Sequence, residues 1–351
     1  MRVLVWLLVL LVMGAEARVQ RKVLILHDME GLSGQDDWRS ISHGYLDLYV
    51  KGQQLLTDDV NAVATGLFDG GATVVHLVDG HGSGNPNPDV LLDQLDARVQ
   101  HVYRDRPFDP YTDMVEAGAY DAVVTVAMHA KPGSRGFLSH TYTGGVEWWI
   151  NGQSLTEPEL IGYSWGRVGV PVIMVTGDDR LKEDLAKPMP WIEYVTVKKA
   201  KSASEVELIP LDQVHAEMRA AARRALQNLS RMKAMTLEGA VTAGIKARPP
   251  ASLTVLRGVP GVNYADNGVT FTAPDFITAY NGMLALVRVA GTGRTSLIME
   301  TLMKQPNGPQ IQRVIGEAMA ARWLDFESGR WSPPPPVPPE LQPQRKYHGA
   351  S

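Results

Sequence analysis

Two carboxylates stand one residue apart at the end of an apolar run and could together bind a metal ion. Asp28 and Glu30 follow the segment 22–27, which reads Lys-Val-Leu-Ile-Leu-His. In an extended strand, residues i and i+2 point to the same face, so both acids should project together from the end of a buried strand. The pair therefore predicts a carboxylate-rich metal site at a strand end.

Two histidines follow other apolar segments in a similar way. His81 stands between two glycines after one such segment, and His129 directly follows another. The carboxyl ends of parallel strands lie on one edge of a sheet, so these histidines should converge with the acids. Each residue alone also fits a structural role, as a solvated acid, a turn histidine or a buried histidine. Together, His and carboxylate ligands suit a hydrolytic zinc, manganese or cobalt centre.

The elements that would position these residues follow an alternating pattern. Apolar, β-branched segments predict buried parallel strands at 22–27, 73–78, 121–127 and 170–176. Helical spacing of apolar residues predicts helices at 55–68, 88–94, 111–118 and about 158–165. Strands that alternate with helices predict an α/β fold, with a mostly parallel sheet and helices on both faces.

The pattern changes after residue 189. An alternating segment at 191–197 predicts a partly exposed strand, an amphipathic helix follows at 211–229, and strands at 253–256 and 268–272 precede a helix at about 274–289. We therefore expect an α/β metal-binding catalytic domain over residues 18–189 and a smaller α+β subdomain over 190–330.

Both ends of the chain predict segments outside the fold. A basic start, a short apolar run from Val3 to Met13 and Ala15-Glu16-Ala17 predict a signal peptide over residues 1–17. An exported protein, periplasmic or secreted, would then begin near Arg18, with no stable membrane insertion after cleavage. An uncleaved N-terminal anchor is the alternative. The proline-rich tail, 331–351, predicts a disordered extension.

Composition limits the classes of protein and site that remain. The 351 residues are 44% hydrophobic and 21% charged, which is ordinary globular material. The chain has no cysteine, so a metal site must use His, Asp and Glu. The net charge of -4, without blocks of basic residues, provides no electrostatic footprint for nucleic acid.

Six short motifs in order resemble those of a known peptidase family. The segments 27–34, 79–81, 128–130, 138–141, 150–157 and 175–179 are similar to successive motifs of the zinc-dependent D-aminopeptidase family, the DppA-type metallopeptidases. The resemblance covers about residues 21–290. Six motifs in the family's order make it specific, although each motif is short.

The resemblance implies a dinuclear metal site. Asp28 would bridge two divalent ions, with zinc expected and manganese or cobalt possible for the same ligands. Glu30 and His129 would complete one ion, and His81 and Glu157 the other. Two ions roughly 3.5–4 Å apart can share a water nucleophile and lower its pKa towards neutrality.

Glu159, two residues after Glu157, is the alternative candidate for the metal ligand in this segment. Thr156-Glu157-Pro158-Glu159 also reads as a helix start in which a glutamate completes a capping box with Thr156, and either glutamate could be that residue. The register from Asn151 favours Glu157 as the metal ligand and Glu159 as the cap.

Other polar residues near these motifs have two readings. His140 matches the family's catalytic histidine; it would transfer protons or stabilise an oxyanion rather than act as a covalent nucleophile, and otherwise it is a surface histidine. Asp178 and Asp179 could bind the substrate amine or orient ligand histidines, but more often such a pair caps a helix. His27 departs from the family, in which a small residue is more usual before the aspartate.

These expectations combine into a metallo-aminopeptidase. It would remove N-terminal residues from short peptides, with the preference for D-amino acids and a ring-like homo-oligomer implied by the resemblance. One alternative is a metal-dependent amidohydrolase that acts on a non-peptide amide. Another is a periplasmic peptide-binding protein without catalysis. Such a protein would retain no divalent metal, and chelators would not change its stability.

Overall fold

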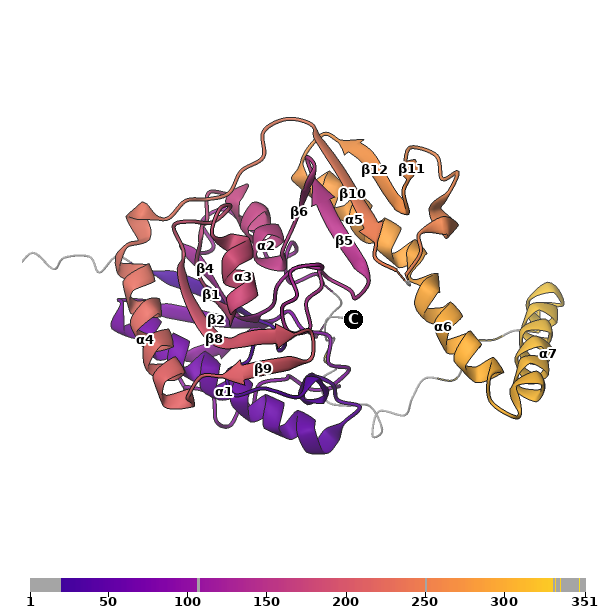
Figure 1. Cartoon of the computed structure of the whole chain (residues 1–351), viewed down its shortest axis with the longest axis horizontal. Coiled ribbons are helices and arrows are strands. Elements are labelled where there is room, and N and C mark those ends of the chain that lie inside the picture. Colours follow the sequence, from indigo (N-terminus) through magenta and orange to yellow (C-terminus); the bar gives the residue numbers. More distant parts are fainter. Residues whose placement is uncertain are drawn as a thin grey trace, which may run out of the picture.

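The computed structural model describes residues 20–105, 108–249 and 251–330 together with residues 332, 335 and 347 (Figure 1). The predicted signal peptide, 1–17, lies outside the described residues, as does most of the predicted tail. Within that tail, Tyr347 is buried and its hydroxyl donates a hydrogen bond to Asp79. The prediction of a free extension is therefore wrong at Tyr347.

The larger sheet carries the predicted parallel strands. Its order is β3-β2-β1-β4-β7-β8-β9; neighbours from β3 to β8 run parallel, and β9 runs antiparallel to β8. Four strands lie within two residues of their predicted positions: β1, Lys22–His27; β2, Val74–Asp79; β4, Ala122–Met128; and β7, Val172–Asp178. The other strands are β3, Val99–His101; β8, Glu193–Ser202; and β9, Glu205–Leu208.

Helices cover both faces of this sheet, as predicted. The long helix α1, Leu46–Asp69, packs beside α4, Leu211–Gln227, and the two lie along one face (Figure 1). Helices α2, Glu157–Gly166, and α3, Asp179–Leu185, lie on the other. Alternate residues of β1 divide between these layers: Val23 and Ile25 pack with α1 and α4, and Leu24 and Leu26 pack with α2. Burial on both faces explains why the central strands are continuous apolar runs.

A second, antiparallel sheet packs against the α2 side. Its order is β11-β12-β10-β5-β6, with bounds β5, Val146–Ile150; β6, Gln153–Ser154; β10, Val241–Ala247; β11, Asn263–Ala265; and β12, Gly268–Ala273. Helix α5, Phe276–Ala290, covers this sheet and begins at the N-cap Asp275, which accepts a hydrogen bond from the Thr278 amide. Tyr280 of α5 packs on Trp148 of β5 in the shared core.

The predicted division at residue 189 does not coincide with the division between the sheets. Strands β8 and β9 and helix α4 belong to the larger sheet, whereas β5 and β6 of the smaller sheet come from residues 146–154. The alternating pattern after Trp191 reflects the position of β8 near an edge of the larger sheet, where one strand face is less covered. The chain therefore enters the smaller sheet, returns to the larger one, and then completes the smaller sheet.

Three other local predictions are wrong. Residues 88–94 and 111–118 form turns rather than helices, and 253–256 contains a short 3-10 helix, Thr254–Leu256, rather than a strand. Other 3-10 helices are Trp38–Ile41 and Leu229–Arg231. Asp89 explains the first error, because its carboxylate binds the Tyr49 and Ser83 hydroxyls and so holds the segment in a turn.

Two further helices follow α5. Helices α6, Thr292–Met303, and α7, Gly308–Glu327, extend away from both sheets and appear in orange and yellow in Figure 1. None of the helices in the described part of the chain combines the length and the apolar character that a membrane span needs.

Candidate metal centre

The predicted site residues meet at one edge of the larger sheet. Strands β2, β1 and β4 are neighbours, and their carboxyl ends lead to His81, to Asp28 and Glu30, and to His129. Glu157, the first residue of α2, joins them after the chain has made the β5–β6 hairpin. The structure therefore brings together all five residues that were predicted as metal ligands.

The chain turns sharply after β1, so Asp28 and Glu30 lie in a turn rather than in an extended strand. The turn crosses the end of β4, where the Gly31 amide donates to the Ala127 carbonyl at 2.8 Å. A Cβ atom on Gly31 would lie 1.9 Å from the Met128 carbonyl oxygen, so only glycine fits there. Both acids still face the same histidine, as their spacing predicted.

Asp28, Glu30 and His81 form the first group of potential ligands. His81 Nδ1 lies 2.8 Å from Asp28 Oδ1 and 3.3 Å from Glu30 Oε2. The other ring nitrogen, Nε2, lies 2.9 Å from the Ile41 carbonyl. Because a carbonyl can only accept, Nε2 carries a proton, and neutral His81 presents the Nδ1 lone pair to the two carboxylates.

Asp28, His129 and Glu157 form the second group. His129 Nε2 lies 3.3 Å from both Asp28 Oδ2 and Glu157 Oε1. His129 Nδ1 lies 3.1 Å from the Ala130 carbonyl, which places the proton of the neutral ring there. His129 Nε2 is buried and has no hydrogen-bond partner among the described residues. A cation between these three side chains would complete its environment.

Asp28 belongs to both groups through different oxygens, an arrangement in which one carboxylate can bridge two ions. The groups pair the other residues differently from the prediction, however. Glu30 lies with His81 and Glu157 lies with His129, and in each group the potential ligand atoms lie within 4.8 Å of one another. The resemblance implied the opposite pairing, in which Glu30 shares an ion with His129, and a third potential group, which joins Glu30, His129 and His140, keeps those two residues together.

The electrostatics of the two groups call for positive charge. Burial alone would lower the pKa of His129, but the Glu157 and Asp28 carboxylates outweigh it and hold that pKa well above its usual value. His81 behaves in the same way beside Glu30 and Asp28. Burial would raise the pKa of Asp28, but the neighbouring His129 and His81 imidazoles hold it well below its usual range. Metal cations could replace these imidazole protons.

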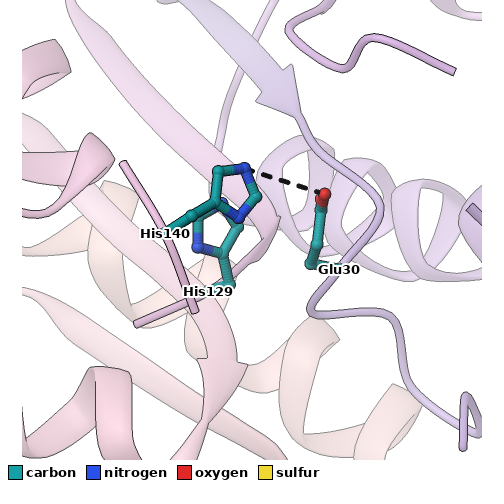
Figure 2. A group of neighbouring side chains, drawn as sticks. All are labelled: Glu30, His129 and His140. Atoms are coloured by element: carbon teal, nitrogen blue, oxygen red, sulfur yellow. Dashed lines mark ion pairs between the residues drawn. The ribbon is translucent and has the colours of Figure 1, made fainter. Parts of the chain in front are cut away.

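His140 lies at the rim of the two groups. Its ring stacks on that of His129, with 4.0 Å between centroids, and Figure 2 shows it facing Glu30. His140 Nε2 lies 4.0 Å from Glu30 Oε1 and 3.9 Å from Glu157 Oε1. His140 Nδ1 lies 2.8 Å from the Leu138 carbonyl, so neutral His140 presents an unprotonated Nε2 to the site. Glu30, His129 and His140 also form a potential ligand group.

Glu157 is held by two contacts that the sequence did not reveal. The Tyr111 hydroxyl donates to Oε2, and the Tyr142 amide donates to Oε1 at 2.6 Å. Glu159 instead forms the predicted capping box with Thr156. The ambiguity between the two glutamates is thus resolved by their surroundings. Tyr111 had no detectable signal, because its segment was predicted as a helix.

A buried lysine supports the turn after β1. Lys198 Nζ donates to the Glu30 carbonyl at 2.8 Å and to Gln35 Oε1 at 2.7 Å. Burial lowers the pKa of Lys198 to about 7, against the opposing effect of nearby acids such as Asp178. The sequence contained a weak signal for this contact, namely a lysine directly after the apolar residues of β8.

Asp178 and Asp179 have structural roles. Asp178 caps α3 through the Leu181 amide and also accepts from the Phe137 amide, at 2.8 Å each. Asp179 accepts from the Ala200 amide at 2.7 Å. These contacts match the capping alternative, and the bond to Phe137 supports the loop that leads to His140.

His27 does not join the metal-ligand groups. Its ring is fully buried, its Nε2 lies 3.8 Å from Asp79 Oδ1, and neither ring nitrogen has a hydrogen-bond partner in the described part of the chain. Burial lowers the pKa of His27 despite the nearby Asp79. The ring is therefore a neutral neighbour below the site.

A cavity of about 750 Å³ opens over the two groups. Asp28, Glu30 and Glu157 are among the residues that line it. Residues of segment 108–113 and of helix α5 line it as well. The site is thus buried at its ligands but accessible to a small molecule through the cavity.

The chemistry of the side chains fits zinc. Carboxylate oxygens and imidazole nitrogens, without thiolates, are ligands of catalytic zinc centres. Backbone carbonyls orient both ligand imidazoles, as is usual for metal-binding histidines.

Comparison with known proteins identifies the family. A family model described as D-aminopeptidase matches residues 21–285, which is more than half of the chain. The chain belongs to the D-aminopeptidase family. The predicted family and the predicted enzyme class, a metallo-aminopeptidase, are therefore confirmed.

A curated sequence and a solved structure, both from Bacillus subtilis, match this D-aminopeptidase family member. A curated D-aminopeptidase from strain 168 is 26% identical over 275 residues, which cover 77% of this chain and 97% of the relative. A solved structure, described as the Zn-dependent D-aminopeptidase DppA, a self-compartmentalizing protease, matches with a TM-score of 0.69 and 25% identity. That match also covers 77% of this chain and 97% of the other. The predicted fold class is confirmed by this likeness.

Proposed function

We propose that this chain is an exported, dinuclear zinc aminopeptidase that removes N-terminal D-amino acids from short peptides. The shared position of Asp28 carries the proposal, because its two oxygens face His81 and His129 in separate ligand groups. The zinc dependence of the DppA relative favours zinc, and manganese or cobalt would accept the same ligands.

The residues of the two groups would hold one ion each. Asp28, Glu30 and His81 would bind the first, and Asp28, His129 and Glu157 the second. When bound, such a pair of ions polarises the scissile carbonyl and lowers the pKa of a water molecule. Tyr111 and the Tyr142 amide fix both oxygens of Glu157, so this ligand is oriented before the substrate arrives.

His140 would transfer the proton. Its Nε2 is free to accept a proton from the attacking water and to return it to the leaving amine, because Nδ1 is occupied by the Leu138 carbonyl. The nearby Glu30 and Glu157 carboxylates would stabilise the resulting imidazolium. At 22% exposure, the side chain of His140 is also more accessible to the cavity than those of His81 and His129.

Export and assembly form two further parts of the proposal. The signal-peptide pattern of residues 1–17 supports export, and cell-wall turnover would then supply peptides that contain D-alanine. The relative's description as self-compartmentalizing supports a homo-oligomer. Mass analysis of the secreted chain tests both: a new N-terminus near Arg18 and a multimer are expected, and an intact leader or a monomer would contradict the corresponding part.

An amidase assay tests the central part of the proposal. The purified protein is loaded with zinc, manganese or cobalt and given D-alanyl and L-alanyl dipeptides of otherwise identical structure, with Asp28→Ala as the control. We expect metal-dependent cleavage of the D-substrate and no cleavage by the variant. Equal turnover of both enantiomers would remove the D-specific claim, and an active Asp28→Ala protein would remove the dinuclear site.

A further inference from the structure

One face of helix α5 lines the cavity that the candidate metal ligands also line. Asn281, Leu284 and Arg288 stand at positions i, i+3 and i+7, and all three line the cavity. Buried residues on the other side of α5, such as Ala279 and Met283, fix the helix against the smaller sheet. Arg288 is therefore presented to the cavity by a rigid element.

The charge of Arg288 has no carboxylate partner in the part of the chain that the structure describes. Among the described residues, no carboxylate oxygen lies within 4.0 Å of its guanidinium. Asp109, an acid of the same cavity, is already engaged: its Oδ1 accepts from the Tyr111 amide at 2.9 Å and its Oδ2 from the Tyr280 hydroxyl at 2.7 Å. Arg288 thus offers its N–H donors to a ligand.

The other arginine of the cavity differs from Arg288. Arg104 is buried, and its two terminal nitrogens donate to the Asp79 carbonyl at 3.2 Å and the Phe108 carbonyl at 2.7 Å. These bonds link two backbone segments and occupy both terminal nitrogens of the Arg104 guanidinium. Arg288 is exposed and makes no comparable backbone bonds within the described chain, so it is the better candidate for binding a substrate anion.

A single residue connects Arg288 to the metal centre. The Tyr142 amide donates to Glu157 Oε1 at 2.6 Å, while its side chain interacts with Arg288. Burial raises the pKa of Tyr142 to about 12, and the Arg288 guanidinium opposes that rise. Tyr142 therefore contacts both the candidate ligand Glu157 and Arg288, and all three residues line the same cavity.

We propose that Arg288 binds the C-terminal carboxylate of the substrate and so selects di- and tripeptides with a free C-terminus. This inference rests on the proposed function, because it takes the scissile bond to lie at the metal centre. Arg288 is a specificity residue that acts at the far end of the substrate. It lies beyond residues 21–285, which match the family model, so the family match does not predict it.

Kinetics with D-alanyl-D-alanine and its C-terminal amide test the proposal, because the two peptides share the scissile bond and differ in the terminal charge. We expect the wild-type protein to have a KM about tenfold lower for the free acid. Arg288→Ala should raise the KM for the free acid by about tenfold and leave kcat and the amide kinetics nearly unchanged. Arg288→Lys should restore part of the preference.

A matched control and a binding measurement separate the possible outcomes. Arg223→Ala removes the same charge from α4, away from the cavity, and should change neither KM. Calorimetry on the zinc-loaded His140→Ala protein should show binding of the free acid that weakens about tenfold when Arg288→Ala is added. Equal KM values for acid and amide in the wild-type protein would overturn the inference and leave the proposed function intact. Carboxylate-dependent binding without hydrolysis by the wild-type protein would overturn the proposed function instead, and binding of neither peptide would overturn the inference.

Discussion

The two sides of the cavity are built in different ways. On the metal side, Asp28, His81 and His129 follow the ends of three neighbouring strands, and their backbones are fixed by the larger sheet. Another part of the lining, here called the wall, comes from the turns of segment 108–113 and from α5, which covers the smaller sheet. Under the proposed function, the strand ends would hold the metal ions and the wall would select the substrate.

The largest expected effect is the difference in activity and zinc content between variants of Glu157 and of Glu159. Glu157→Gln should lower kcat/KM more than about a hundredfold and release zinc, because the change removes a charged ligand. Glu159→Gln should preserve activity, since glutamine can also complete the capping box with Thr156. Steady-state kinetics and elemental analysis measure both. An active Glu157→Gln protein with full zinc would break the assignment of the metal side.

Tyr111 belongs to both parts of the cavity lining. It lies in segment 108–113 of the wall, and its hydroxyl donates a hydrogen bond to the candidate ligand Glu157. Tyr111→Phe removes the hydroxyl that donates to Glu157 and should weaken zinc binding by about ten- to a hundredfold. Competition with a chromogenic chelator measures the affinity. If only the KM for peptides changes, Tyr111 acts as a wall residue and its contact with Glu157 has no influence on the metal.

The metal side should also respond to pH. The pKa values of His81 and His129 are raised by their carboxylate neighbours. Without metal, both rings therefore stay in the doubly protonated, cationic form to higher pH than a free histidine. A metal ion must displace these protons; its affinity should therefore fall as the pH falls below those pKa values, by about tenfold per pH unit for each proton released. Zinc titrations between about pH 8 and pH 6 measure the slope. A flat profile would show that these histidines are not ligands.

The smallest effect is expected on the wall itself. Asn281→Ala removes a neutral group from the cavity face of α5 and should raise the KM for dipeptides by about threefold. Its zinc content and kcat should match those of the wild-type protein. A loss of zinc from this variant would mean that the two sides of the cavity are not independent.

The same division explains what the sequence could predict. The strands β1, β2, β4 and β7 were predictable because burial on both faces makes them continuous apolar runs. Once they are placed in a parallel sheet, the carboxyl ends of the strands must meet, so Asp28, Glu30, His81 and His129 could be predicted to converge. Glu157 begins a helix and was named only through the family resemblance.

The wall could not be predicted in this way. Segment 111–118 has helical spacing but forms turns, and the Asp109 carboxylate, which accepts from the Tyr111 amide, stabilises the turn at its start. The smaller sheet takes β5 and β6 from one part of the chain and β10 to β12 from another, so no local pattern reveals it. Tyr111 and Arg288 reach the cavity only through these long-range contacts.

Zinc stoichiometry tests the shared role of Asp28 most directly. Elemental analysis of the purified protein should find two zinc ions per chain in the wild type and one after Glu30→Gln, because Glu30 belongs to only one of the two groups that contain Asp28. Asp28→Asn should bind neither ion, because it removes a charged ligand from both groups. An Asp28→Asn protein that keeps one zinc ion at full occupancy would contradict the bridge, as would a wild-type protein that binds one ion in all.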